Sequence, residues 1–253
     1  MDSMIKVPKE DGAWWMALTC WICGWGASLA ITWEPLVVGS AFVSLMFMAQ
    51  TLRSCRRLWR IEPGRAGRLL AMACMGVLLP IATFSLLIVR TNDLPWTLAA
   101  TVPSILYGIV LVLGKERRPW ARLLGVVSLT SISAVTYACA VGRFDTISTI
   151  LWSALGLYFL LGSILVMARF RRSRGALLFV RVSSLAVVAG TIVCSFHGLL
   201  HWVIGGGFLL LGARSFLVDT ETRPADPKKL GNRELAYASI SAALVLAGIW
   251  MIR

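Results

Sequence analysis

Three groups of charged or imidazole side chains carry most of the chemistry that this chain could perform. The first group, Lys9, Glu10 and Asp11, precedes a long apolar segment. Carboxylates at a helix N-terminus complement the helix dipole and accept hydrogen bonds from free backbone N–H groups, so capping is one interpretation. The other interpretation is a polar site, in which the three side chains project into a cytoplasmic cavity and bind a ligand.

A stripe of four arginines follows the second apolar segment, and its members are Arg53, Arg56, Arg57 and Arg60. Their spacing of i, i+3, i+4 and i+7 places them on one helix face if the helix continues past Leu52. Guanidinium groups bind phosphate through paired N–H donors, so the stripe could hold an anionic ligand. The alternative is an anchor whose side chains lie among membrane headgroups. Arg169 and Arg172, after the sixth apolar segment, are candidates for the same ligand.

The two histidines, His197 and His201, are spaced i, i+4, which puts both on one face of a helix and can support a metal site. No third ligand lies nearby in the sequence, so an interfacial polar turn is the simpler interpretation. Cys20 and Cys23 form a C-x-x-C inside an apolar run, where cysteines commonly pack as small hydrophobic groups. Gly205–Gly207 offer a small surface for close helix contacts. We predict no metal site and no cofactor.

The elements that position these residues follow from the composition. The chain has 253 residues, is 58% hydrophobic and 15% charged, and has a mean hydropathy of +0.77. Segments of about 18 or more apolar residues can cross a hydrocarbon core of roughly 30 Å, and they are too long for barrel strands. We therefore expect an all-α integral membrane protein, a polytopic bundle of about nine transmembrane helices. The expected spans are Ala13–Ile31, Leu36–Leu52, Leu69–Val89, Pro95–Leu113, Leu123–Val141, Thr146–Ala168, Ala176–Cys194, Leu200–Leu217 and Leu235–Ile252.

The basic residues predict how this bundle is oriented. Of the 25 Lys and Arg residues, 22 lie in or near alternate gaps between spans, and the other three are Arg90, Arg143 and Arg253. This bias predicts a cytoplasmic N-terminal segment, residues 1–12, followed by a single polytopic domain, residues 13–253, with its C-terminus outside. Tryptophans near the span ends, Trp14 and Trp15 among them, fit an aromatic belt at each membrane interface.

The net charge of +13 indicates which partners the chain attracts. No soluble module presents the basic residues, so we expect anionic membrane lipids as partners and no nucleic acid. No acidic residue lies deep within a predicted span. A charge at the bilayer centre usually marks an ion or proton path, so its absence argues against a proton-coupled transporter with a midplane carboxylate.

The start of the chain resembles a known family. Pro8–Trp14 reads Pro-Lys-Glu-Asp-Gly-Ala-Trp, and the YwiC-like bacterial membrane proteins open their first span with Pro-Lys-Glu-His-Gly, usually followed by Ala-Trp. Asp11 stands in place of the histidine, so a role that requires imidazole cannot be carried over. Arg169–Arg174 and, more loosely, Pro227–Glu234 resemble the family's middle and late regions. The resemblance implies a multi-pass protein of the bacterial cytoplasmic (inner) membrane and supplies no reaction.

The expected architecture is also similar to that of the UbiA-type intramembrane prenyltransferases. That family has nine helices, a cytoplasmic N-terminus and working loops after helices two and six, where two Asp-rich motifs hold Mg²⁺ on a prenyl diphosphate. Here the two corresponding loops carry arginines, and Glu62 is their only acid. Mg²⁺ requires oxygen ligands such as carboxylates, so the usual metal-dependent chemistry lacks its ligands.

Three functions follow from these observations. The first is a lipid-embedded binding or carrier protein whose arginine-rich cytoplasmic mouth takes an anionic lipid, an isoprenoid phosphate or a small anion. The second is a UbiA-like intramembrane transferase with non-standard carboxylates, namely Glu10 and Asp11 with Glu62 or Glu116. The third is a structural or assembly subunit that joins a membrane-complex partner through its small-residue faces.

Overall fold

A computed structural model of the protein describes residues 11–59, 61–115, 118–171, 173–217 and 227–252, and no strand occurs in this part of the chain. It contains the helices α1 (Asp11–Ser28), α2 (Glu34–Leu58), α3 (Pro63–Met75), α4 (Leu78–Thr91), α5 (Leu94–Val112), α6 (Pro119–Val141), α7 (Thr146–Arg171), α8 (Arg174–Phe196), α9 (Val203–Leu217) and α10 (Pro227–Ile252). Six of them, α2, α5, α6, α7, α8 and α10, are long and apolar enough to cross a membrane. The chain is therefore an all-α protein with the composition of a multi-pass membrane protein.

The helices follow the predicted segments closely. Eight of the nine predicted spans coincide with one helix each, and α2 continues past Leu52, as the arginine stripe requires. The third prediction is wrong in one respect. The segment Leu69–Val89, which we expected as a single helix, is divided between α3 and α4 at Gly76 and Val77.

The division has a physical cause in Pro80. Proline has no backbone N–H, so the carbonyl of Gly76, four residues earlier, loses its helical donor, and the proline ring also crowds that carbonyl. The hydroxyl of Ser44 in α2 replaces the donor, because its Oγ donates to the Gly76 carbonyl oxygen at 2.7 Å. A neighbouring helix thus satisfies the carbonyl that the proline kink sets free, as the lipid environment demands.

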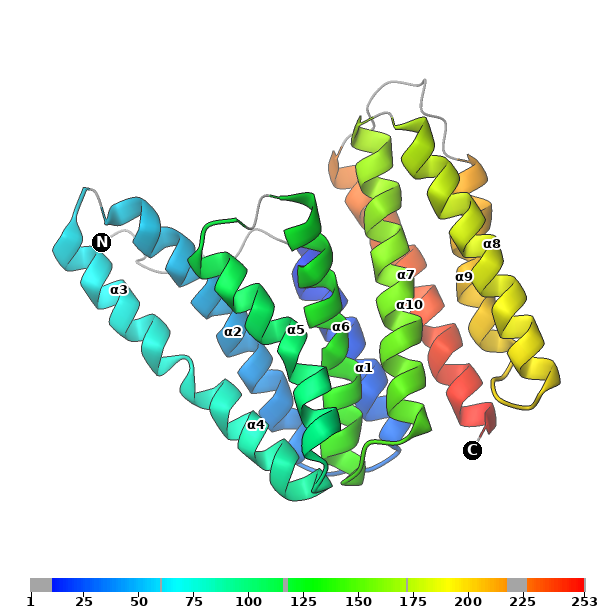
Figure 1. Ribbon diagram of the computed structural model, residues 1–253, viewed down its shortest axis with the longest axis horizontal. Coiled ribbons are helices and arrows are strands. Elements are labelled where there is room, and N and C mark those ends of the chain that lie inside the picture. Colours follow the sequence, from blue (N-terminus) through cyan, green and yellow to red (C-terminus); the bar gives the residue numbers. More distant parts are fainter. Residues whose placement is uncertain (1–10, 60, 116–117, 172, 218–226, 253) are drawn as a thin grey trace.

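Helix α6 lies in the middle of the bundle and packs against α1, α2, α5 and α7 (Figure 1). Its buried face carries small polar residues. Ser131, Ser133 and Thr136 each donate a hydroxyl hydrogen bond to a carbonyl of the preceding turn. A Cβ atom at Gly24 of α1 would overlap the Ser133 carbonyl, so the two backbones are in close contact. Such small-residue contacts hold helices together where lipid removes the usual hydrophobic driving force.

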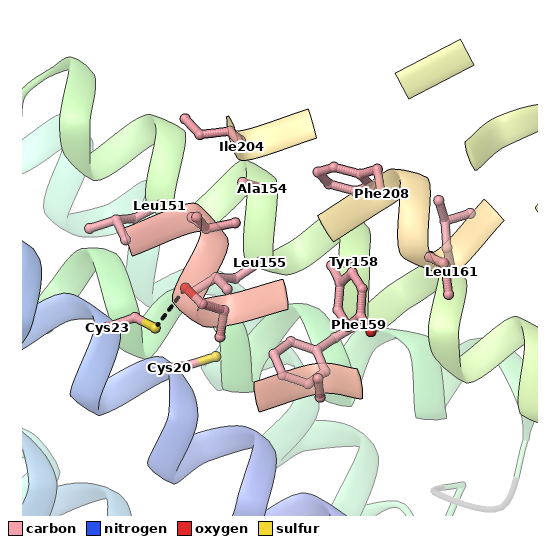
Figure 2. Close-up of a cluster of buried hydrophobic side chains, with 14 of the residues drawn as sticks. Cys20, Cys23, Leu151, Ala154, Leu155, Tyr158, Phe159, Leu161, Ile204 and Phe208 are labelled. Carbon is pink, nitrogen blue, oxygen red and sulfur yellow. Dashed lines mark hydrogen bonds between the residues drawn. The ribbon is translucent and has the colours of Figure 1, made fainter. Parts of the chain in front are cut away.

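A buried cluster of apolar side chains joins α1, α6, α7, α8, α9 and α10, and Figure 2 shows part of it. Tyr158 of α7 and Phe208 of α9 meet edge-on with their ring centroids 6.3 Å apart. Cys20 and Cys23 lie in the same cluster with 0% and 4% of their surface exposed, and both are free thiols. This confirms the packing interpretation of the C-x-x-C.

Glycines hold α9 between α8 and α10. A Cβ atom at Gly205 would lie 2.6 Å from Oγ1 of Thr191 in α8. A Cβ atom at Gly207 would lie 3.1 Å from Cβ of Ser241 in α10. The prediction that Gly205–Gly207 serve close helix contacts is confirmed, and the neighbouring surfaces belong to the chain itself.

Candidate functional site

The described basic residues gather at one end of the bundle. The last turns of α2, α5, α7 and α9 and the first turns of α3, α6, α8 and α10 lie at this end, at the top of Figure 1. The described Lys and Arg side chains in or near these turns are Arg53, Arg56, Arg68, Lys115, Arg118, Arg122, Arg169, Arg174, Arg181, Arg214 and Arg233. The described side chains at the opposite end include only two such residues, Arg90 and Arg143. We call the first end the basic end.

The two arginine groups predicted as one mouth lie apart within the basic end. Helices α2 and α7 pack on different sides of α6, and α5 and α6 separate their ends in Figure 1. The ends of α2 and α7, the helices that carry Arg53 and Arg169, therefore lie apart. Arg56 turns toward α5, since a Cβ atom at Gly114 would overlap the Arg56 guanidinium. The helix ends that carry the two arginine groups thus occupy different parts of the basic end.

Part of the predicted site lies outside the described residues. These positions are Lys9, Glu10, Arg60 and Arg172. The backbones of Asp11 and Arg57 are described, in α1 and α2, but the description does not extend to their side chains. Arg53, Arg56 and Arg169 are the predicted ligand-binding residues with described side chains.

The carboxylates assigned to a transferase are described only in part. Glu10 and Glu116 lie outside the described residues, and Glu62 is exposed at the N-cap of α3. Within the described chain, His, Cys, Asp and Glu form no group of three or more that could hold a metal ion.

The histidines lie in the link between α8 and α9, which agrees with the favoured interpretation of a polar turn and rules out the alternative of a shared helix face. Helix α8 ends at Phe196, and Gly198 has a φ of +69°, which breaks the helical path. His201 Nδ1 accepts a hydrogen bond from the Val203 N–H at 3.4 Å, next to the start of α9. His197 and His201 therefore belong to a polar turn.

A groove of about 700 Å³ runs along the surface between α1 and α2. Its lining consists of Trp14, Trp15, Ala17, Leu18, Trp21, Leu36, Gly39, Ser40, Phe42, Val43 and Phe47. Ser40 supplies the only side-chain hydroxyl among these residues, and its Oγ donates to the Val37 carbonyl of its own helix. The volume falls within the range of roughly 300–1,000 Å³ found for small-molecule sites.

The groove exists because α1 and α2 pack against α6 but make little contact with each other. Trp14 closes part of the gap, with its ring centroid 6.0 Å from that of Phe42 and 5.9 Å from that of Phe47. The sequence shows the tryptophans but not the separation of the helices, so we assigned Trp14 and Trp15 to an interfacial belt.

Positive charge follows the groove along α2. Arg53 comes three helical turns after Phe42, so the two residues share a helix face. Arg53 lies about 9 Å along the helix axis beyond Phe47, the lining residue of α2 closest to the basic end. The Arg53 guanidinium group therefore lies beyond the apolar groove, on the side of the basic end.

Two ion pairs among the described side chains join neighbouring helices. Glu34, at the start of α2 and 3% exposed, accepts a hydrogen bond from Arg90 in the last turn of α4. Arg214 of α9 pairs with Glu234 of α10, and its guanidinium carbon lies 4.7 Å from the centre of the Tyr237 ring. Each pair joins two helices, and Glu34 and Arg214 are buried although the Arg90 side chain is 41% exposed. Both pairs therefore belong to the scaffold of the bundle.

The groove and the charge beyond it have the chemistry of a site for an amphipathic anion. The resemblances to YwiC-like proteins and to UbiA-type enzymes stay predictions from the sequence. No family model matches this chain, and no curated protein and no solved structure matches it either.

Proposed function

We propose that the protein binds a lipid with a phosphate headgroup, with the apolar chain in the groove between α1 and α2 and the phosphate near Arg53. The observation that carries the proposal is the aromatic groove leading toward the basic end. Guanidinium groups form paired, charge-assisted hydrogen bonds with phosphate. A small anion without a chain would leave the groove unused, so we favour an anionic lipid or an isoprenoid phosphate.

The headgroup and the groove have different tasks in this proposal. Lipid tails in a bilayer are as apolar as the groove, so a chain gains little from the hydrophobic effect when it enters. Affinity then comes from van der Waals contacts and from hydrogen bonds to a charged group, which contribute about 1.5–3 kcal/mol each. The phosphate therefore sets the affinity, and the groove sets which chain is accepted.

We also propose that the chain crosses a bacterial cytoplasmic membrane nine times, with the basic end in the cytoplasm. Helices α3 and α4, of 13 and 14 residues, would form one kinked crossing about 40 Å long. Helix α9, with 15 residues, spans only about 22 Å and would cross together with the link before it. A reporter enzyme fused to the C-terminus is expected to be active only outside the cytoplasm. Cytoplasmic activity of that reporter would contradict this topology.

Binding is tested with purified protein in nanodiscs of neutral lipid. The probe is fluorescent lysophosphatidic acid, and the competitors are a monoacylglycerol with the same chain and inorganic phosphate. We expect unlabelled lysophosphatidic acid to displace the probe and both competitors to fail. Full displacement of the probe by inorganic phosphate would show that the site binds anions without a chain. Full displacement by monoacylglycerol would show that the phosphate headgroup is not recognised. Either result would overturn the proposal.

Matched substitutions locate the binding. Val43→Trp fills the groove, whereas Val182→Trp places the same ring on an exposed position of α8 away from it. Arg53→Gln removes the charge beyond the groove, whereas Arg143→Gln removes an exposed charge at the opposite end. Arg53→Gln is expected to weaken binding about tenfold through the loss of one charge-assisted contact, and Val43→Trp to weaken it by blocking entry of the chain. The two controls should leave binding unchanged. Equal effects of a variant and its control would overturn the proposal.

A further inference from the structure

Trp21 fills the space between α1 and α2 at the end of the groove away from the basic end. Its indole Nε1 donates to the carbonyl oxygen of Pro35 at 2.7 Å. Its ring lies against Gly39, where a Cβ atom would be 3.0 Å from the ring atoms Cε2 and Nε1. The ring therefore reaches from α1 to the backbone of α2, and only the missing side chain of Gly39 leaves space for it.

A second indole continues this filling. The ring centroids of Trp21 and Trp25 are 5.2 Å apart, and Trp25 Nε1 donates to the Ala30 carbonyl oxygen at 3.0 Å. Trp21 contributes to the groove lining, but Trp25 does not. The space between α1 and α2 is therefore open from Trp14 to Trp21 and occupied by anchored indoles from there to the turn that joins the helices.

The open part has the depth of about one leaflet. From Trp14 to Trp21 the axis of α1 rises about 10 Å, and from Leu36 to Phe47, the first and last lining residues of α2, its axis covers about 16 Å. One leaflet contributes about 15 Å, half of a hydrocarbon core of roughly 30 Å. A chain that extends much further must either displace Trp21 or leave the groove sideways.

We propose that Trp21 closes the chain-binding groove and confines the ligand to the leaflet at the basic end. The inference rests on the proposed function and narrows its ligand. The ligand carries a phosphate headgroup, and its apolar part is a fatty acyl chain or a short isoprenoid. A long polyisoprenoid phosphate, whose chain crosses the bilayer midplane, does not fit the closed groove.

Photo-cross-linking tests this assignment directly. Phosphatidic acid analogues carry a diazirine either near the headgroup or at the end of one chain, and mass spectrometry identifies the labelled peptides in nanodiscs. We expect the first probe to label residues near Trp14 and Phe47, and the second to label residues near Trp21 and Gly39. Neither probe should label residues 29–35, the segment beyond the two indoles.

A matched pair of variants tests the role of Trp21. Trp21→Ala and Trp25→Ala each remove one indole and one hydrogen bond to a backbone carbonyl, but only Trp21 lines the groove. With a longer chain that carries a terminal diazirine, Trp21→Ala is expected to shift the labelled site into residues 29–35. Trp25→Ala should leave the labelled site unchanged.

The outcomes separate this inference from the proposed function. Labelling of residues 29–35 in the unchanged protein, or an unshifted site in Trp21→Ala, would overturn the closure by Trp21 while groove binding stands. If Trp21→Ala does not fold, the labelling of residues 29–35 in the unchanged protein still tests whether Trp21 closes the groove. Failure of excess lysophosphatidic acid to reduce groove labelling would instead overturn the proposed function itself.

Discussion

The two sides of the bundle are packed in different ways. On the side of α8, α9 and α10, glycines bring backbones together and the Arg214–Glu234 pair is buried between two helices. On the other side, α1 and α2 diverge around a groove, and most of the described side chains of α3, which packs against α2, are exposed. A tightly packed side resists change in volume, whereas a side with unfilled apolar surface can accept another molecule. This contrast is the main reason for placing the site between α1 and α2.

The largest expected effect comes from the tightly packed side. Glu234→Gln leaves Arg214, whose side chain is only 9% exposed, without its counter-charge. Breaking a buried pair costs about 3–5 kcal/mol, so thermal unfolding in detergent should show a large loss of stability. Joint replacement by Arg214→Met and Glu234→Leu should recover most of it. As a control, Arg143→Met breaks an exposed pair and should cost at most about 1 kcal/mol. Similar losses in Glu234→Gln and Arg143→Met would contradict the difference in burial.

Added volume should be the next most costly change on the same side. A Cβ atom at Gly248 of α10 would overlap Ile204 of α9, so Gly248→Leu must force the helices apart. Overpacking typically costs about 1–3 kcal/mol, measurable as a lower unfolding temperature. Gly190→Leu in α8 and Gly67→Leu in α3 have open space around the new side chain and should cost nothing. If Gly248→Leu were as stable as these two controls, the α9–α10 contact would be looser than described.

The kink between α3 and α4 should respond to a smaller change. Ser44→Ala removes the hydroxyl that serves the Gly76 carbonyl, and we expect a cost of about 1 kcal/mol. In a Pro80→Ala background the backbone N–H returns, so the same substitution should cost nothing. The coupling is read from a double-mutant cycle of unfolding free energies. Ser40→Ala, which removes an exposed hydroxyl of the same helix, is the control. Additive costs would show that the two groups act independently.

The smallest effect on stability is expected in the groove. Val43→Trp replaces an isopropyl group by a bulky indole, but the new ring can occupy unfilled space between α1 and α2. We expect its unfolding free energy to stay within about 0.5 kcal/mol of the unchanged protein, as for ordinary surface changes. A loss as large as that of Gly248→Leu would mean that the two sides are equally tight.

Most helix positions could be predicted because each apolar run ends at charged or helix-breaking residues. The division of Leu69–Val89 also had a signal, since Pro80 removes the donor for the Gly76 carbonyl. The presence of a proline does not by itself show whether a helix bends or is divided. Pro103, by comparison, lies inside α5 without dividing it. The outcome depends on which neighbour, here Ser44, can serve the freed carbonyl.

The groove and the ion pairs were beyond what the sequence could predict. Arg90 stood out as a basic residue outside the alternating pattern, but its partner Glu34 is 56 positions away in the chain. Likewise, Trp14, Trp21 and Gly39 form a groove only because two helices diverge over α6. Both features depend on tertiary packing, which helix periodicity does not encode.

The distribution of thiols around the kink makes the native chain suitable for labelling. All six cysteines lie in the described part of the chain; four are buried, Cys194 is half-buried, and only Cys74 is exposed. Cys74 precedes Gly76 by two residues. A thiol-reactive spin label or fluorophore should therefore attach chiefly at the bend, without construction of a cysteine-free background. Its spectrum would report whether α3 changes its angle to α4 when a lipid occupies the other side of α2.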